Sequence, residues 1–170
     1  LLGGDRQASR NELRKLTLYA HGKGEITLED VMAVTADASD LKIDLIVDAA
    51  FAGDVATVEK EFAKATVAGT YPGMIISAAQ RQAAWLHKSA LAVADGTSVS
   101  AVLESGYPRL HFSRKASVEA ALRNFSVARL AQIIDQLAAA ALEARKQASL
   151  ASSIAQRALM SVAASAKRRG

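Results

Sequence analysis

Apolar residues recur at helical spacing along almost the whole chain, and this periodicity limits the possible folds most strongly. Val55, Val58, Phe62 and Ala65 follow one another at intervals of three or four residues, which places them on one face of an amphipathic helix. No stretch alternates apolar and polar residues for long enough to indicate a β-sheet. Only 2 prolines occur in 170 residues, and alanine and leucine, both strong helix formers, are frequent. The sequence therefore predicts an all-α fold.

Capping residues divide this pattern into separate helices. Gly22, Gly53 and Gly96 are suited to end helices because glycine adopts the left-handed conformation cheaply, and Asp54 is suited to begin one by capping its free amides. The expected helices are 9–21, a short helix from 27, a helix ending before 53, a helix after 54, a long helix ending near 94, a short helix after 97 or 98, and 114–124, 126–147 and 149–166.

Two helical domains are expected, because residues 36–40 are small and polar and are typical of a boundary. Residues 1–40 would form a small domain, and residues 41–170 a larger bundle with 126–147 as its spine. In the first helix of the bundle, the residues expected to face inward are Leu45, Ile46, Ala49 and Ala50.

Basic residues are concentrated near the C-terminus. Residues 1–44 hold 6 basic and 8 acidic residues, residues 45–106 hold 4 and 6, and residues 107–170 hold 11 and 3. The last section alone therefore carries +8, although the whole chain carries only +4. Such asymmetry favours a polyanion or an acidic partner near that end.

Several kinds of site are excluded or disfavoured. The absence of cysteine excludes disulfides and thiol nucleophiles and fits a cytoplasmic protein. No apolar run approaches the length of a membrane span, and Leu1 to Asp5 lack an initiator methionine and a secretory pattern, so we expect a soluble piece of a longer chain. The sequence also lacks a phosphate-binding glycine loop and a Gly-x-Ser-x-Gly turn.

The remaining polar residues give no catalytic or metal site. His21, His87 and His111 have no ligand spacing, so we predict no metal, no cofactor and no catalytic residue. Asp44 and Asp48 share a helix face and could form an acid-base pair, but a solvated face is the more common explanation. A packing role is expected for Trp85.

The order of residues along the chain resembles the delta subunit of the bacterial DNA polymerase III clamp loader. The residues similar to its lid domain are Gly4, Asp5, Asn11, Glu12, Leu13, Lys15, Leu16, Tyr19, Ile26, Thr27, Asp30 and Val31. Those similar to its collar domain are Asp48, Ala49, Ala50, Ala52, Gly53, Asp54, Gln80, Arg81, Leu86, Pro108, Phe112, Lys115, Phe125 and Leu130. The chain departs from the family at Leu142, Glu143 and Lys146, where Asp and Lys are common.

The resemblance implies that residues 1–40 end a lid of the AAA type and that residues 41–170 form the collar, which joins five subunits in a ring. The family's delta subunit does not hydrolyse ATP, and it binds the sliding clamp through an N-terminal domain absent here. The implied partners are the other clamp loader subunits and primer-template DNA in the assembled complex, with no membrane. The family belongs to a DNA-directed DNA polymerase holoenzyme, and this part of it would have no catalysis of its own.

Two alternatives remain open at this stage. Arg6, Arg10 and Arg14 recur every four residues, as they could on the lid of a nucleotide-hydrolysing AAA-type ATPase, although a solvated basic face is the more common explanation. The basic C-terminal section would also permit an unrelated helical bundle that binds nucleic acid by charge.

A basic segment with an aromatic residue is the candidate DNA-proximal site. Arg109, His111, Phe112, Arg114 and Lys115 lie between two expected helices. Cations can bind phosphates and an aromatic ring can stack on an unpaired base, which together suit a primer-template end. In the other interpretation, Phe112 anchors this segment in the core and the cations are solvated.

Overall fold

The computed structural model describes residues 6–22, 24–27, 38–105 and 114–166. Over these ranges the chain forms eight α-helices and one short 3-10 helix, with no strand, so the predicted all-α fold is confirmed. The chain divides into two compact units, Leu1–Leu41 and Lys42–Gly170. This division falls close to the boundary expected from the sequence. The assignment of the units as lid and collar stays a prediction.

In the first unit, helix α1 spans Arg6–Tyr19. It was expected at 9–21, so it both begins and ends slightly earlier than predicted. Gly22 follows with a φ of 88°, the left-handed conformation that its position after a helix predicts. The short helix expected from residue 27 falls largely on residues 28–37, outside the described residues.

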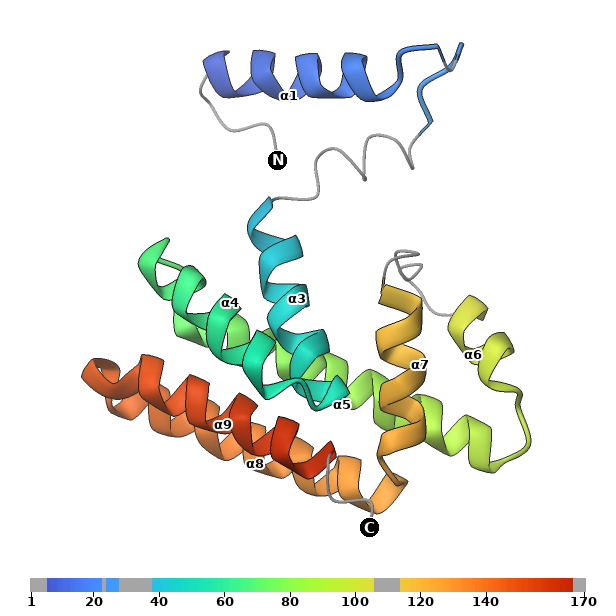
Figure 1. The fold of residues 1–170 in the computed structure, drawn as a ribbon, viewed down its shortest axis with the longest axis vertical. Coiled ribbons are helices and arrows are strands. Elements are labelled where there is room, and N and C mark those ends of the chain that lie inside the picture. Colours follow the sequence, from blue (N-terminus) through green and yellow to red (C-terminus); the bar gives the residue numbers. More distant parts are fainter. Residues whose placement is uncertain (1–5, 23, 28–37, 106–113, 167–170) are drawn as a thin grey trace. The chain divides into compact units, whose positions relative to one another are not determined.

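The second unit contains most of α3 (Ala38–Ala52) and all of α4 (Val55–Val67), α5 (Pro72–Ala94), α6 (Val99–Ser105), α7 (Lys115–Asn124), α8 (Val127–Lys146), the 3-10 helix η2 (Ala148–Leu150) and α9 (Ala151–Ala166). Helices α4, α5, α8 and α9 run roughly alongside one another, and α3 and α7 cross them steeply (Figure 1). Helix α5 packs against α8 and α9, and α9 also packs against α4 and α8.

Helices α7 and α8 meet at a sharp bend of 107°. Among the described residues no single helix is long and apolar enough to span a membrane. These two would reach such a length and composition only as a bent pair. Figure 1 shows α7 as one of the crossing helices and α8 as one of the long ones.

Local capping explains where several helices begin. The Asp54 carboxylate accepts hydrogen bonds from the Thr57 amide at 3.1 Å and the Thr57 hydroxyl at 2.6 Å, so the predicted N-cap of α4 is confirmed. In the same way, the Ser98 hydroxyl accepts a hydrogen bond from the amide of Ala101 in α6, and the Ser126 hydroxyl accepts one from the amide of Arg129 in α8. Gly53, with a φ of 81°, reverses the chain between α3 and α4, as its position predicts.

The core is continuous through the second unit. Leu130 and Leu137 of α8 are fully covered, as is Leu159 of α9. The rings of Phe51 and Phe125 meet edge to face, with centroids 5.8 Å apart, and join α3 to the end of α7. Trp85 is partly buried and packs against this core, so its predicted packing role is confirmed.

The inward face predicted for α3 was partly wrong. Ile46, Ala49 and Ala50 are buried as expected, but Leu45 is 48% exposed. Val47, which the predicted stripe left out, is buried instead. The stripe assumed one apolar and one solvated face, whereas six consecutive residues of α3, 46–51, are all buried, so its buried residues follow no clean helical period.

Candidate functional site

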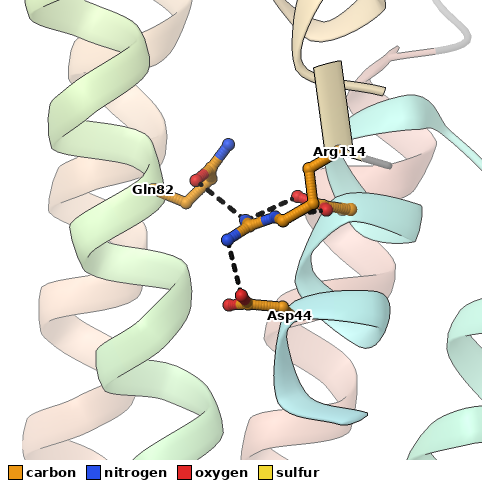
Figure 2. A network of polar contacts seen from close by, with 4 residues as sticks. Asp44, Gln82 and Arg114 are labelled. Atoms are coloured by element: carbon orange, nitrogen blue, oxygen red, sulfur yellow. Dashed lines mark hydrogen bonds and ion pairs between the residues drawn. The ribbon is translucent and has the colours of Figure 1, made fainter. Parts of the chain in front are cut away.

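Arg114, which immediately precedes α7, forms a polar cluster with three residues of α3 and α5 (Figure 2). Its Nε and Nη2 donate to the two carboxylate oxygens of Asp48 at 2.7 and 2.8 Å. Its Nη1 donates to Asp44 at 2.6 Å, and Nη2 also donates to the Gln82 carbonyl oxygen at 3.3 Å. The pair with Asp48 is therefore bidentate, the geometry that suits a planar guanidinium best.

The elements bring these groups together in a simple way. Asp44 and Asp48 are four residues apart and so lie on one face of α3. Gln82 lies in the middle of α5, and Arg114 is the residue from which α7 starts. The cluster thus ties the beginning of α7 to two helices that are distant in sequence.

Burial makes the Asp48 contact the strongest of the set. The side chain of Asp48 is 9% exposed and that of Arg114 is 19%, whereas that of Asp44 is 35% exposed. A charge shielded from water in this way requires a partner, because desolvation would otherwise favour its neutral form. Asp44 adds charge at the edge of the cluster, where water screens it more.

The pKa of Arg114 reflects these opposing effects. Burial disfavours the charged guanidinium and lowers its pKa. The hydrogen bond that Arg114 donates to Asp48 and the charges of Asp48 and Asp44 outweigh burial, so the pKa of Arg114 is raised above its usual value. Arg114 therefore remains a cation, and four of the five N–H groups of a guanidinium are used within the cluster.

Gln82 completes the cluster. Its side-chain nitrogen is buried and has no hydrogen-bond partner among the described residues, while its oxygen faces Arg114. The opposite amide orientation would point N–H donors at a cation, so the contact with Arg114 fixes the orientation. Chemically, the cluster holds charges in place: the carboxylates of Asp44 and Asp48 are engaged by a guanidinium rather than by each other.

The structure corrects the interpretation of Asp44 and Asp48 as a solvated face. Asp48 is 8% exposed and is paired with a residue 66 positions away. The signal in the sequence was an aspartate between apolar residues on both sides, Leu45 to Val47 and Ala49 to Phe51. A carboxylate in such a run needs a buried cation, but the sequence does not say which one.

The predicted DNA-proximal residues are only partly described. Arg109, His111 and Phe112 lie outside the described residues. Arg114 lies in the cluster above, and Lys115, the first residue of α7, is exposed. The DNA-proximal role of the segment stays a prediction. No group of three or more potential metal ligands lies together in the part of the chain that the structure describes.

Comparison with known proteins identifies no relative. No family model, no curated protein and no solved structure matches the chain.

Proposed function

We propose that the chain is the lid end and collar of a clamp loader delta subunit, which helps to assemble the complex that places the sliding clamp on primed DNA. The observation that carries this proposal is the order of family-like residues, from Gly4 and Asp5 through Gly53 and Asp54 to Leu130. A helical hairpin, a long helix and a closing group of helices occur in that same order, which supports the proposal.

The proposed role is assembly rather than catalysis. The second unit offers a rigid helical core, and the cluster of Arg114, Asp44 and Asp48 fixes α7 on it. A rigid body of this kind suits a module that holds subunits in a ring, because an ordered surface loses little conformational freedom on association.

Mixing the chain with the other clamp loader subunits and with the sliding clamp tests this proposal. We expect it to co-purify with the subunits, to leave the clamp unbound and to hydrolyse no ATP. Capture of the clamp would count against the proposal. ATP hydrolysis that responds to a change of Arg10 or Arg14 in α1 would favour the ATPase-lid alternative instead.

A contact with DNA by the segment around Arg109 and Lys115 is part of the proposal. Arg114 should be left unchanged in a test, because its substitution would disturb the fold rather than a phosphate contact. Changing Arg109 and Lys115 to alanine in the full-length subunit should lower the salt slope of primer-template binding by about 2. The same change at Arg81 and Lys88, both exposed on α5, serves as the control. Equal slopes for both pairs would remove the segment from the DNA contact.

A further inference from the structure

Exposed apolar side chains of the second unit gather at one end of the bundle. The large apolar residues exposed in the described part of this unit are Leu45, Val67, Tyr71, Met74, Leu91, Leu142 and Leu150. Val67, Tyr71, Met74 and Leu150 lie in or beside the turns that join α4 to α5 and α8 to α9, and Leu142 lies about one helical turn before the end of α8. Figure 1 shows both turns at the same end. The apolar end is defined here as Val67, Tyr71, Met74, Leu142 and Leu150. Single exposed apolar residues are ordinary, but such a gathering is typical of an interaction surface.

The position of Tyr71 argues that this surface is not incidental. Tyr71 occupies the N-cap of α5, where Ser, Thr, Asp or Asn would cap a free amide, and its side chain makes no such hydrogen bond. The ring is instead 59% exposed. A Cβ added at Gly73 would collide with this ring, so the glycine allows the ring to lie against the backbone. The first turn of α5 therefore lacks a side-chain cap and instead presents an exposed aromatic ring held against Gly73. Aromatic residues of this kind often anchor interfaces.

The charges beside the apolar end are basic. Arg145 and Lys146, in the last turn of α8, are exposed and have no hydrogen bond or ion pair with the described residues. The neighbouring carboxylates are already engaged, Glu143 by Arg157 at 3.3 Å and Glu61 by Lys64 at 2.7 Å. The charge left uncompensated is therefore positive, which repels a second copy of the same end and attracts an acidic partner.

We propose that the apolar end docks a protein segment that presents apolar side chains flanked by Asp or Glu. This inference rests on the proposed function, since the segment would belong to another subunit of the clamp loader. A membrane surface fits less well, because membrane-binding helices present one continuous apolar face flanked by several Lys and Arg. Here the apolar side chains come from three separate α-helices, α4, α5 and α8, and from the two turns, with the carboxylate of Glu143 next to Leu142.

The test measures the affinity of the chain for the other clamp loader subunits. One variant replaces the apolar side chains (Leu142→Ser with Leu150→Ser), and a second reverses the charge (Arg145→Glu with Lys146→Glu). Each should weaken binding about tenfold or more, and the loss in the second should shrink at high salt. All four positions are exposed, so the thermal unfolding of the variants should match that of the wild type.

Three further variants sharpen the result. Leu45→Ser with Leu91→Ser removes equally exposed leucines elsewhere on the unit, and Arg81→Glu with Lys88→Glu makes the same change of charge further along α5. Both control pairs should bind within about threefold of the wild type. Gly73→Ala, which displaces the Tyr71 ring, should weaken binding without loss of stability.

The remaining outcomes distinguish a failure of this inference from a failure of the proposed function. If the wild type binds its partner subunits and the variants at the apolar end bind equally well, this inference is wrong and the proposed function stands. If the wild type captures no subunit, the proposed function fails and the inference fails with it. Dimerisation of the wild type that Leu142→Ser with Leu150→Ser abolishes, or binding to phosphatidylserine vesicles that Arg145→Glu with Lys146→Glu abolishes, would assign the surface to a second copy or to a membrane.

Discussion

At the scale of single residues, the contact between Arg114 and Asp48 is the most consequential polar interaction of the second unit. Replacing Asp48 with alanine would leave a largely covered guanidinium with only the more exposed Asp44 as a counter-charge. We predict a loss of about 2 to 4 kcal/mol in the free energy of unfolding, somewhat below the cost of breaking a fully buried pair. Urea denaturation of the variant and the wild type measures it.

A lysine cannot replace Arg114 in this contact. The ammonium group lacks the planar fork that binds both oxygens of Asp48, so Arg114→Lys should recover less than half of the stability that Arg114→Ala loses. The exposed pair of Arg157 and Glu143 is the control, and breaking it should cost about 0 to 1 kcal/mol. Equal losses at the two pairs would show that the cluster contributes no more than a surface ion pair.

Neighbouring positions of α3 offer a second test at this scale. Ile46 is fully buried and Leu45 is 48% exposed, although the two side chains are similar in size. We predict that Ile46→Ala lowers the free energy of unfolding by about 2 to 5 kcal/mol. For Leu45→Ala the loss should stay below about 1 kcal/mol. Comparable losses, measured by thermal or urea unfolding, would mean that α3 packs with a different face inward.

At the scale of helices, the N-cap of α4 is the clearest local determinant. Asp54 accepts from both the amide and the hydroxyl of Thr57, directly after the left-handed Gly53. Asp54→Ala should cost about 0.5 to 2 kcal/mol, and Asp54→Asn, which keeps an acceptor, should cost much less. Calorimetric unfolding distinguishes the two. An equal effect of both substitutions would indicate that charge, not capping, matters at this position.

What the sequence predicts at this scale follows from the range of the interactions involved. Gly22, Gly53 and Asp54 were identified correctly because capping depends on residues within one helical turn. Leu45 was placed wrongly because the face that α3 buries depends on helices far away in sequence. The partner of Asp48 lies 66 residues along the chain, and no local rule selects it from 21 basic residues.

At the scale of the whole chain, the two compact units predict that the second folds by itself. Residues 38–170 contain all of α3 and the whole core cluster. We therefore expect this shortened chain to unfold cooperatively, with a Tm within about 4 °C of that of the intact chain. A helical circular dichroism spectrum with no cooperative transition would mean that residues before 38 are needed to complete the core.

The basic C-terminal section also takes a different meaning at this scale. Of its cations, Arg114 is neutralised by Asp44 and Asp48, which lie outside this section, whereas Arg123 and Arg157 pair with Glu119 and Glu143 within it. Of these pairings, only that of Arg114 therefore neutralises part of the +8 charge, because Glu119 and Glu143 are already counted in that sum. The exposed cations that remain along α7 and α8 include Lys115, Arg145 and Lys146, at opposite ends of this helical segment. Two separate partners, DNA at one end and protein at the other, would fit this distribution.

Native mass spectrometry of the chain mixed with the other clamp loader subunits tests the proposed function most directly. The expected result is a ring-sized complex that contains one copy of this chain, because residues 42–170 would occupy one position in the collar. The full-length delta subunit under the same conditions is the positive control. A chain that remains separate while the full-length subunit assembles would contradict the assignment of these residues as a collar.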